Sequence, residues 1–131
     1  MKTQTKILLI RIAGVVSILF TLFHAGFYWI FKWSQTLTMM NPIDKGILLT
    51  FNLIGVILLL YSVILSFGYA RQLIETTVGK SLLLFFTVFY VIRIFSEFVY
   101  FGFHMPSSVL IIALCLIPAI CFGLPVFLKS K

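Results

Sequence analysis

The sequence predicts an all-α membrane protein folded as an antiparallel bundle of four transmembrane helices. Its composition is far from that of a soluble domain, with 62% hydrophobic and 10% charged residues and a mean hydropathy of +1.19. Four apolar segments are each close to the ~20 residues that a helix needs to cross a bilayer. They cover residues 7–31, 46–70, 81–103 and 107–128. We therefore expect one membrane domain over residues 1–131 and no separate soluble domain.

The first segment, residues 7–31, is expected to be a retained helix. Its apolar stretch is longer than the ~7–15 residues of a signal-peptide core, and no small-residue cleavage motif follows it. The connector over residues 32–45 is rich in polar and turn-forming residues. It ends in Asn41-Pro42-Ile43-Asp44, where proline at an early position predicts the start of the second helix.

The remaining connectors are short, which predicts an up-down-up-down arrangement of neighbouring helices. Residues 71–80 link the second and third segments, and residues 104–107 link the third and fourth. In the last connector, Pro106 should end one helix and Ser107 or Ser108 should cap the next.

The fourth segment contains two prolines and both cysteines of the chain. Pro118 and Pro125 predict a bend, because each removes a backbone donor from the helix. Cys115 and Cys121 are six residues apart on one helix, a separation that does not favour a disulfide. We expect both thiols to be buried packing groups.

The net charge of +7 predicts orientation and not a nucleic-acid partner, because the basic residues flank the apolar segments. Seven of them fall on one side of the predicted bundle and two on the other. The larger group predicts the cytoplasmic side of a plasma membrane, with both termini inside. It consists of Lys2, Lys6, Arg11, Arg71, Lys80, Lys129 and Lys131, against Lys32 and Lys45 outside.

Arg93 and Glu97 lie one helical turn apart within the third apolar segment. Ionisable residues inside a membrane are costly and usually face a protein interior or a wet cavity. At a spacing of four residues the two side chains can pair. The third segment also places five polar residues at spacings of 3, 4, 3 and 4, which predicts a single polar face. These are Tyr90, Arg93, Glu97, Tyr100 and His104.

Polar residues of the first and second segments reach the same depth. With ~1.5 Å of rise per residue, His24, Asn52 and the Arg93–Glu97 pair share one layer in the outer half of the membrane. For the hydroxyl groups of these segments we expect hydrogen bonds between helices. The sequence therefore predicts a ligand pocket in this layer, with three tyrosines as further candidates. The site residues are His24, Asn52, Arg93, Glu97, Tyr28, Tyr90 and Tyr100.

The predicted function is the binding of a small amphipathic or anionic ligand, of the lipid, isoprenoid or quinone type. Membrane lipids are the expected partners, and a homo-oligomer or a larger membrane complex is compatible with the sequence. No catalytic motif is present, so a non-enzymatic role is favoured while catalysis stays open.

Two other functions remain as alternatives. One is proton-coupled transport through Glu97, since a membrane carboxylate in a four-helix protein resembles the architecture of the small multidrug resistance exporters. Those exporters carry the acid in the first helix without an arginine beside it, unlike Glu97. The other is a non-catalytic accessory or scaffold subunit.

No metal or cofactor is predicted. A haem b held by His24 and His104 is the least favoured possibility, because the estimated depths of the two imidazoles differ by about 10 Å.

Overall fold

A computed structural model describes residues 1–128 and contains four long helices. These are α1 (Thr3–Ala25), α4 (Pro42–Gly68), α6 (Thr77–Val99) and α7 (Ser107–Phe127). Each is long and apolar enough to cross a membrane. Three short helices lie in the connectors: α2 (Phe27–Ile30), α3 (Trp33–Thr36) and α5 (Ala70–Glu75). The predicted four-helix fold is confirmed, and the chain is a small multi-pass membrane protein.

Two of the long helices, α4 and α6, begin earlier than the hydropathy predicts and have polar side chains that cap them. α4 begins at the predicted Asn41-Pro42 signal, where the Asn41 side chain accepts a hydrogen bond from the Asp44 amide at 2.9 Å. α6 begins four residues before the predicted bound, where Thr76 Oγ1 accepts from the Gly79 amide at 2.9 Å. Such caps are polar, so a search for apolar windows starts inside the helix.

All four long helices end before their predicted bounds, and the two largest differences, at α1 and α6, correct the expected polar face. α1 ends at Ala25 and α6 at Val99, although apolar residues continue beyond both ends. Tyr28 therefore lies in α2, and Tyr100 lies beyond α6 with 81% of its surface exposed. The five-residue polar face of the third segment is broken after Glu97.

The prediction that Ser107 or Ser108 caps α7 is also wrong, because both hydroxyls are engaged elsewhere. Ser107 Oγ donates to the carbonyl of His104, and Ser108 Oγ donates to the carboxylate of Glu97.

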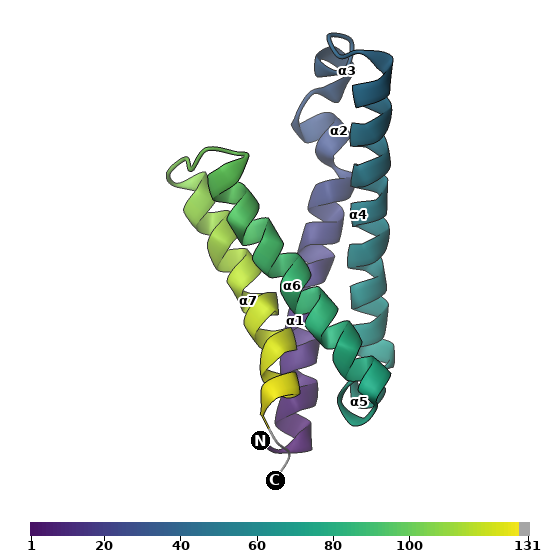
Figure 1. Ribbon diagram of the computed structural model, residues 1–131, viewed down its shortest axis with the longest axis vertical. Helices are drawn as coiled ribbons and strands as arrows, with labels where there is room; N and C mark the ends of the chain where they lie inside the picture. The colour runs from purple at the N-terminus through teal and green to yellow at the C-terminus, as the bar shows by residue number, and fades with distance from the viewer. Residues whose placement is uncertain (129–131) are drawn as a thin grey trace.

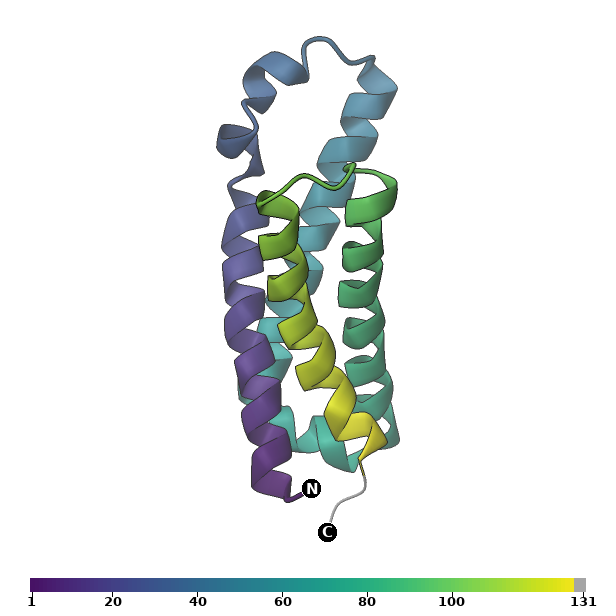
Figure 2. The same cartoon turned by 90° about the vertical axis from the view of Figure 1, so that its left-hand side faces the viewer.

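The four long helices form two antiparallel hairpins that are joined at one end and separated at the other. α1 packs on α4 and α7, and α6 packs on α7. In Figure 1, α6 and α7 lean away from α1 and α4 toward the end that carries the connectors over residues 26–41 and 100–106. We call this end the open end. The opposite end, which carries α5, the start of α1 and the end of α7, is the closed end (Figure 1 and Figure 2).

Close backbone approaches and one buried lysine hold the closed half together. A Cβ on Gly14 would lie 2.7 Å from Ser66 Cβ, so α1 and α4 approach closely there. Lys6 is only 3% exposed, and its Nζ donates to the carbonyl oxygens of Pro125 at 3.1 Å and Leu128 at 2.6 Å. These carbonyls end α7, where a cation is favourable. Lys6, counted above as a flanking charge, thus ties α1 to α7.

The proline and cysteine residues of α7 lie within the helix. Pro118 and Pro125 are both buried inside it, and Cys115 and Cys121 are buried and free, as predicted for packing residues. The start of α1 and the end of α7 lie at the same end of the bundle, but which side of the membrane this end faces stays a prediction. Two basic residues that support that prediction, Lys129 and Lys131, lie outside the described residues.

Candidate functional site

A hydrogen bond between the hairpins marks the point from which they diverge. The hydroxyl oxygens of Ser17 on α1 and Tyr90 on α6 are 2.8 Å apart. Ser17 donates to the carbonyl of Ala13 at 2.9 Å, so the Tyr90 hydroxyl is the donor to Ser17. The ring of Phe20 lies against Tyr90 with the centroids 5.8 Å apart. Tyr90, Ser17 and Phe20 form the floor of the space between the hairpins.

On the α6–α7 side of this space, Glu97 connects the two helices. Its Oε2 accepts from Arg93 Nη1 at 2.8 Å, and its Oε1 accepts from Ser108 Oγ at 2.7 Å. Ser108 Oγ in turn accepts from the His104 amide at 2.7 Å. Glu97 is 4% exposed and Ser108 is 1% exposed. Both oxygens of Glu97 accept hydrogen bonds, which is the pattern of an ionised carboxylate.

The guanidinium of Arg93 is held between this carboxylate and an aromatic ring. Its Cζ lies 4.6 Å from the ring centroid of Phe101, a cation–π arrangement. The side chain of Arg93 keeps 24% of its surface exposed, against 5% for Glu97. The arginine therefore reaches the space between the hairpins, while the glutamate lies behind it.

On the α1–α4 side, His24 and Asn52 form a second polar pair. Asn52 Nδ2 donates to the carbonyl of His24 at 3.2 Å, and Asn52 Oδ1 lies 3.4 Å from His24 Nδ1. The ring of His24 stacks on Phe27, with the centroids 4.3 Å apart. These contacts fix the imidazole at the wall that faces α6.

His24 and Arg93 line one cavity, although they belong to different hairpins. This cavity, which we call the polar cavity because His24 and Arg93 line it among mainly apolar residues, has a volume of about 180 Å³ and is lined by residues of α1, α4 and α6. Phe20 and Tyr90 line it at the floor, and Ser96 adds a hydroxyl on the α6 wall. The structure thus places two of the predicted site residues on facing walls of the same space.

A larger aromatic cavity adjoins the polar one at the open end. Its volume is about 590 Å³, and His24 lines both cavities. Asn52 lines the aromatic cavity as well. Five aromatic side chains dominate its wall: Phe27, Phe31, Trp33, Phe51 and Phe101.

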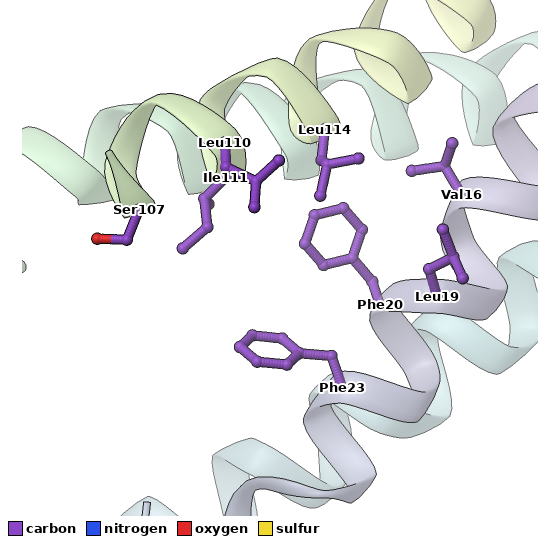
Figure 3. A pocket seen from close by; sticks show the side chains of 8 residues that line it. All are labelled: Val16, Leu19, Phe20, Phe23, Ser107, Leu110, Ile111 and Leu114. Carbon is purple, nitrogen blue, oxygen red and sulfur yellow. The ribbon is translucent and has the colours of Figure 1, made fainter. Parts of the chain in front are cut away.

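A third cavity of about 390 Å³ lies between α1 and α7 and is almost entirely apolar. Figure 3 shows side chains of the two helices pointing toward one another across it. Leu110, Ile111 and Leu114 of α7 face Leu19, Phe20 and Phe23 of α1. Phe20 also lines the polar cavity, so one side chain forms a wall common to both spaces.

The three tyrosines predicted for the site lie in different places. Tyr90 is 1% exposed and belongs to the floor. Tyr28 and Tyr100 are 45% and 81% exposed, on the surface of the molecule. Tyr28 contacts the ring of Trp29.

Several contacts at the site were not predicted. The partner of Glu97 on α7 is Ser108, and the ring beneath Arg93 is that of Phe101. The short connector between the third and fourth segments is a signal that these residues are close, but it does not reveal which side chains meet. The expected hydrogen bonds between helices are largely absent among the described residues, because Thr21, Ser62 and Ser66 donate to carbonyls of their own helices.

Within residues 1–128, no group of three or more His, Cys, Asp or Glu side chains is placed to hold a metal ion. His104 lies in the exposed connector between α6 and α7, whereas His24 lines two cavities. The cofactor expectation stays a prediction.

Comparison of the chain with protein-family models, with curated proteins and with solved structures gives no match. The function is therefore argued from the geometry of the site.

Proposed function

We propose that this membrane protein binds an amphipathic, lipid-type ligand between its two hairpins, with the polar head between His24 and Arg93. The observation that carries the proposal is that these two side chains line one cavity from opposite hairpins. Sites for small ligands are mainly apolar concave spaces with a few converging polar groups. The polar cavity and its two neighbours match that description.

Arg93 has hydrogen-bonding capacity left for a ligand. A guanidinium carries five N–H donors, and the hydrogen bond to Glu97 uses Nη1. Across the described residues, every fully buried side-chain nitrogen or oxygen has a partner. The remaining donors of Arg93 therefore lie at accessible surface. A buried ion pair is weak evidence for stability, so a role in ligand recognition explains the pair better.

The neighbouring cavities offer room for an apolar body. The aromatic cavity shares His24 with the polar cavity, and the apolar cavity shares Phe20 with it. In the orientation that the basic residues predict, the open end faces outward. We therefore propose that the ligand enters from the outer leaflet of a plasma membrane.

Proton exchange by Glu97 receives no support from this geometry. The carboxylate is buried, and its two oxygens are engaged by Arg93 and Ser108. The transporter alternative needs an acid that substrate or water can reach, so lipid binding is the better account.

Mass spectrometry of lipids extracted from the purified protein tests the proposal. Arg93→Ala should lose a lipid that the wild-type protein retains. Arg71→Ala is the matched control, because Arg71 also pairs with a glutamate four residues on, at 2.9 Å, but with 73% of its side chain exposed.

A second variant protects the test against misfolding of Arg93→Ala. Ser96→Phe adds bulk to the polar cavity and leaves the Arg93–Glu97 pair in place. It should also lose the lipid. Unchanged lipid content in both variants contradicts the proposal and fits an accessory subunit instead.

A further inference from the structure

The hydrogen-bond pattern around His24 determines which of its ring nitrogens carries a proton. A backbone carbonyl can only accept, so the Asn52 group next to the His24 carbonyl is its NH₂. The amide oxygen of Asn52 then faces His24 Nδ1, at 3.4 Å. An oxygen acceptor at that place favours the tautomer with the proton on Nδ1. In a neutral imidazole the other nitrogen, Nε2, is then an acceptor.

The charges around the polar cavity are already balanced. Arg93 is paired with Glu97, and the second oxygen of Glu97 is occupied by Ser108. The residues that line the cavity include no further charged side chain. A second positive charge on His24 would have no carboxylate to offset it, and an anionic ligand would leave a net negative charge at an apolar depth. A charged imidazole together with an anionic ligand would also balance but would bury two further charges, so a neutral imidazole and an uncharged ligand fit the site better.

The two walls of the polar cavity therefore need different hydrogen-bonding groups on a ligand. Arg93 offers donors on the α6 wall, and His24 lines the cavity from α1. Since no fully buried side-chain nitrogen lacks a partner in the part of the chain that the structure describes, the free acceptor Nε2 of a neutral His24 lies at accessible surface. A carbonyl or ether head can accept from Arg93 but has no hydrogen for His24. A hydroxyl group can do both, because it has one donor hydrogen and two acceptor lone pairs.

We propose that the ligand is a lipid alcohol whose un-ionised hydroxyl accepts from Arg93 and donates to His24 Nε2. This inference rests on the proposed function and narrows its ligand class. The rest of such a ligand is hydrocarbon, which suits the aromatic and apolar cavities that share His24 and Phe20 with the polar one. Anionic lipids and ketone-type heads are correspondingly excluded.

Competition binding with three ligands that share the farnesyl chain but differ in their head groups tests the inference. The wild-type protein in phosphatidylcholine nanodiscs is equilibrated with tritiated farnesol and challenged with unlabelled farnesol, farnesyl methyl ether or farnesyl phosphate. The ether lacks only the donor hydrogen, and the phosphate adds charge. Loss of one hydrogen bond in a buried site corresponds to about a tenfold change in affinity. We expect both analogues to compete at least about tenfold more weakly than farnesol.

A variant of His24 separates recognition from a purely structural effect. His24→Phe keeps a ring that can stack on Phe27 and removes the acceptor. It should bind farnesol and the methyl ether with equal, weakened affinity. His104→Phe, which changes an exposed histidine of the connector, should keep the wild-type preference.

Three results would overturn the lipid-alcohol inference: an ether that competes as well as farnesol, a phosphate that competes better, or no specific farnesol binding. None of them affects the Arg93-dependent retention of a lipid measured for the proposed function. The two proposals therefore fail separately.

Discussion

The chain contains two Arg–Glu pairs with the same local design and different surroundings. Arg71 and Glu75 lie in α5 at the closed end, and Arg93 and Glu97 lie in α6 toward the open end. In both pairs the glutamate follows four residues after the arginine, and the N–O distances are 2.9 Å and 2.8 Å. The exposed fractions of the side chains are 73% and 54% in the first pair, but 24% and 5% in the second.

This difference shows that the spacing of four residues on a helix brings the two side chains together, whereas tertiary packing decides how much the pair contributes to stability. When an exposed ion pair forms, each charged group gives up hydrogen bonds to water for contacts with its partner, with little net gain in free energy. Dissolved ions also screen the attraction between the two charges. A buried pair has lost its water, so each charge depends on the other. Glu97 also accepts from Ser108 on the neighbouring helix, which makes the second pair part of the contact between α6 and α7.

The largest expected difference between the two pairs follows removal of the acid. Glu97→Ala leaves Arg93 without its carboxylate and Ser108 without its acceptor. We expect a loss of about 3–5 kcal/mol in the free energy of unfolding. Glu75→Ala at the exposed pair should cost less than about 1 kcal/mol. Titration of the purified protein with sodium dodecyl sulfate in mixed micelles, followed by circular dichroism, measures both values.

Equal losses in the free energy of unfolding for Glu97→Ala and Glu75→Ala would show that the buried pair stabilises the protein no more than the exposed pair does. The proposal that the surroundings distinguish the pairs would then be wrong, even if the geometry of both were correct.

Replacing both members of a pair should sharpen the comparison. Arg93→Met combined with Glu97→Leu removes the unpaired charge that the single variant leaves behind. We expect the double variant to be at least about 2 kcal/mol more stable than Glu97→Ala. The equivalent double change of Arg71 and Glu75 should equal the sum of its single changes within about 0.5 kcal/mol. The same unfolding titrations give both double-mutant cycles.

The sequence predicts the helices and the buried pair because both depend on local properties. Apolar length identifies four spans, and a separation of four residues brings Arg93 to Glu97. The common depth of His24 and Arg93 also follows from counting residues along each helix. These predictions need no knowledge of how the helices pack.

What the sequence does not predict depends on long-range packing. The divergence of the hairpins, the bond from Ser108 to Glu97 and the insertion of Lys6 at the end of α7 all depend on how separate helices pack. Helix rotation and crossing angle decide these contacts, and neither has a local sequence signal. For Tyr100 the local pattern is misleading. Its spacing of three residues from Glu97 predicts a common helix face, but α6 ends at Val99.

The contact between α6 and α7 allows a smaller, more specific test. Ser108→Ala removes both the donor to Glu97 and the acceptor of the His104 amide, and leaves the ion pair intact. The expected cost is about 1.5–3 kcal/mol, the range for a hydrogen bond to a charged group. Ser107→Ala is the adjacent control, because its hydroxyl is exposed and bonds only to the local carbonyl of His104. Its cost should be below about 0.5 kcal/mol. If the two serine variants lose the same stability, the bond to Glu97 does not hold the two helices together.

The smallest expected effect concerns salt. Raising sodium chloride from about 0.05 M to about 0.5 M shortens the screening length from roughly 14 Å to roughly 4 Å. The exposed pair should then lose its few tenths of a kcal/mol, so Glu75→Ala should become as stable as the wild-type protein. The cost of Glu97→Ala should stay constant, because ions do not enter the apolar surroundings of that pair. A salt-dependent cost at Glu97 would mean that water and ions reach the carboxylate. The charge balance that favours an uncharged ligand would then lose its physical basis.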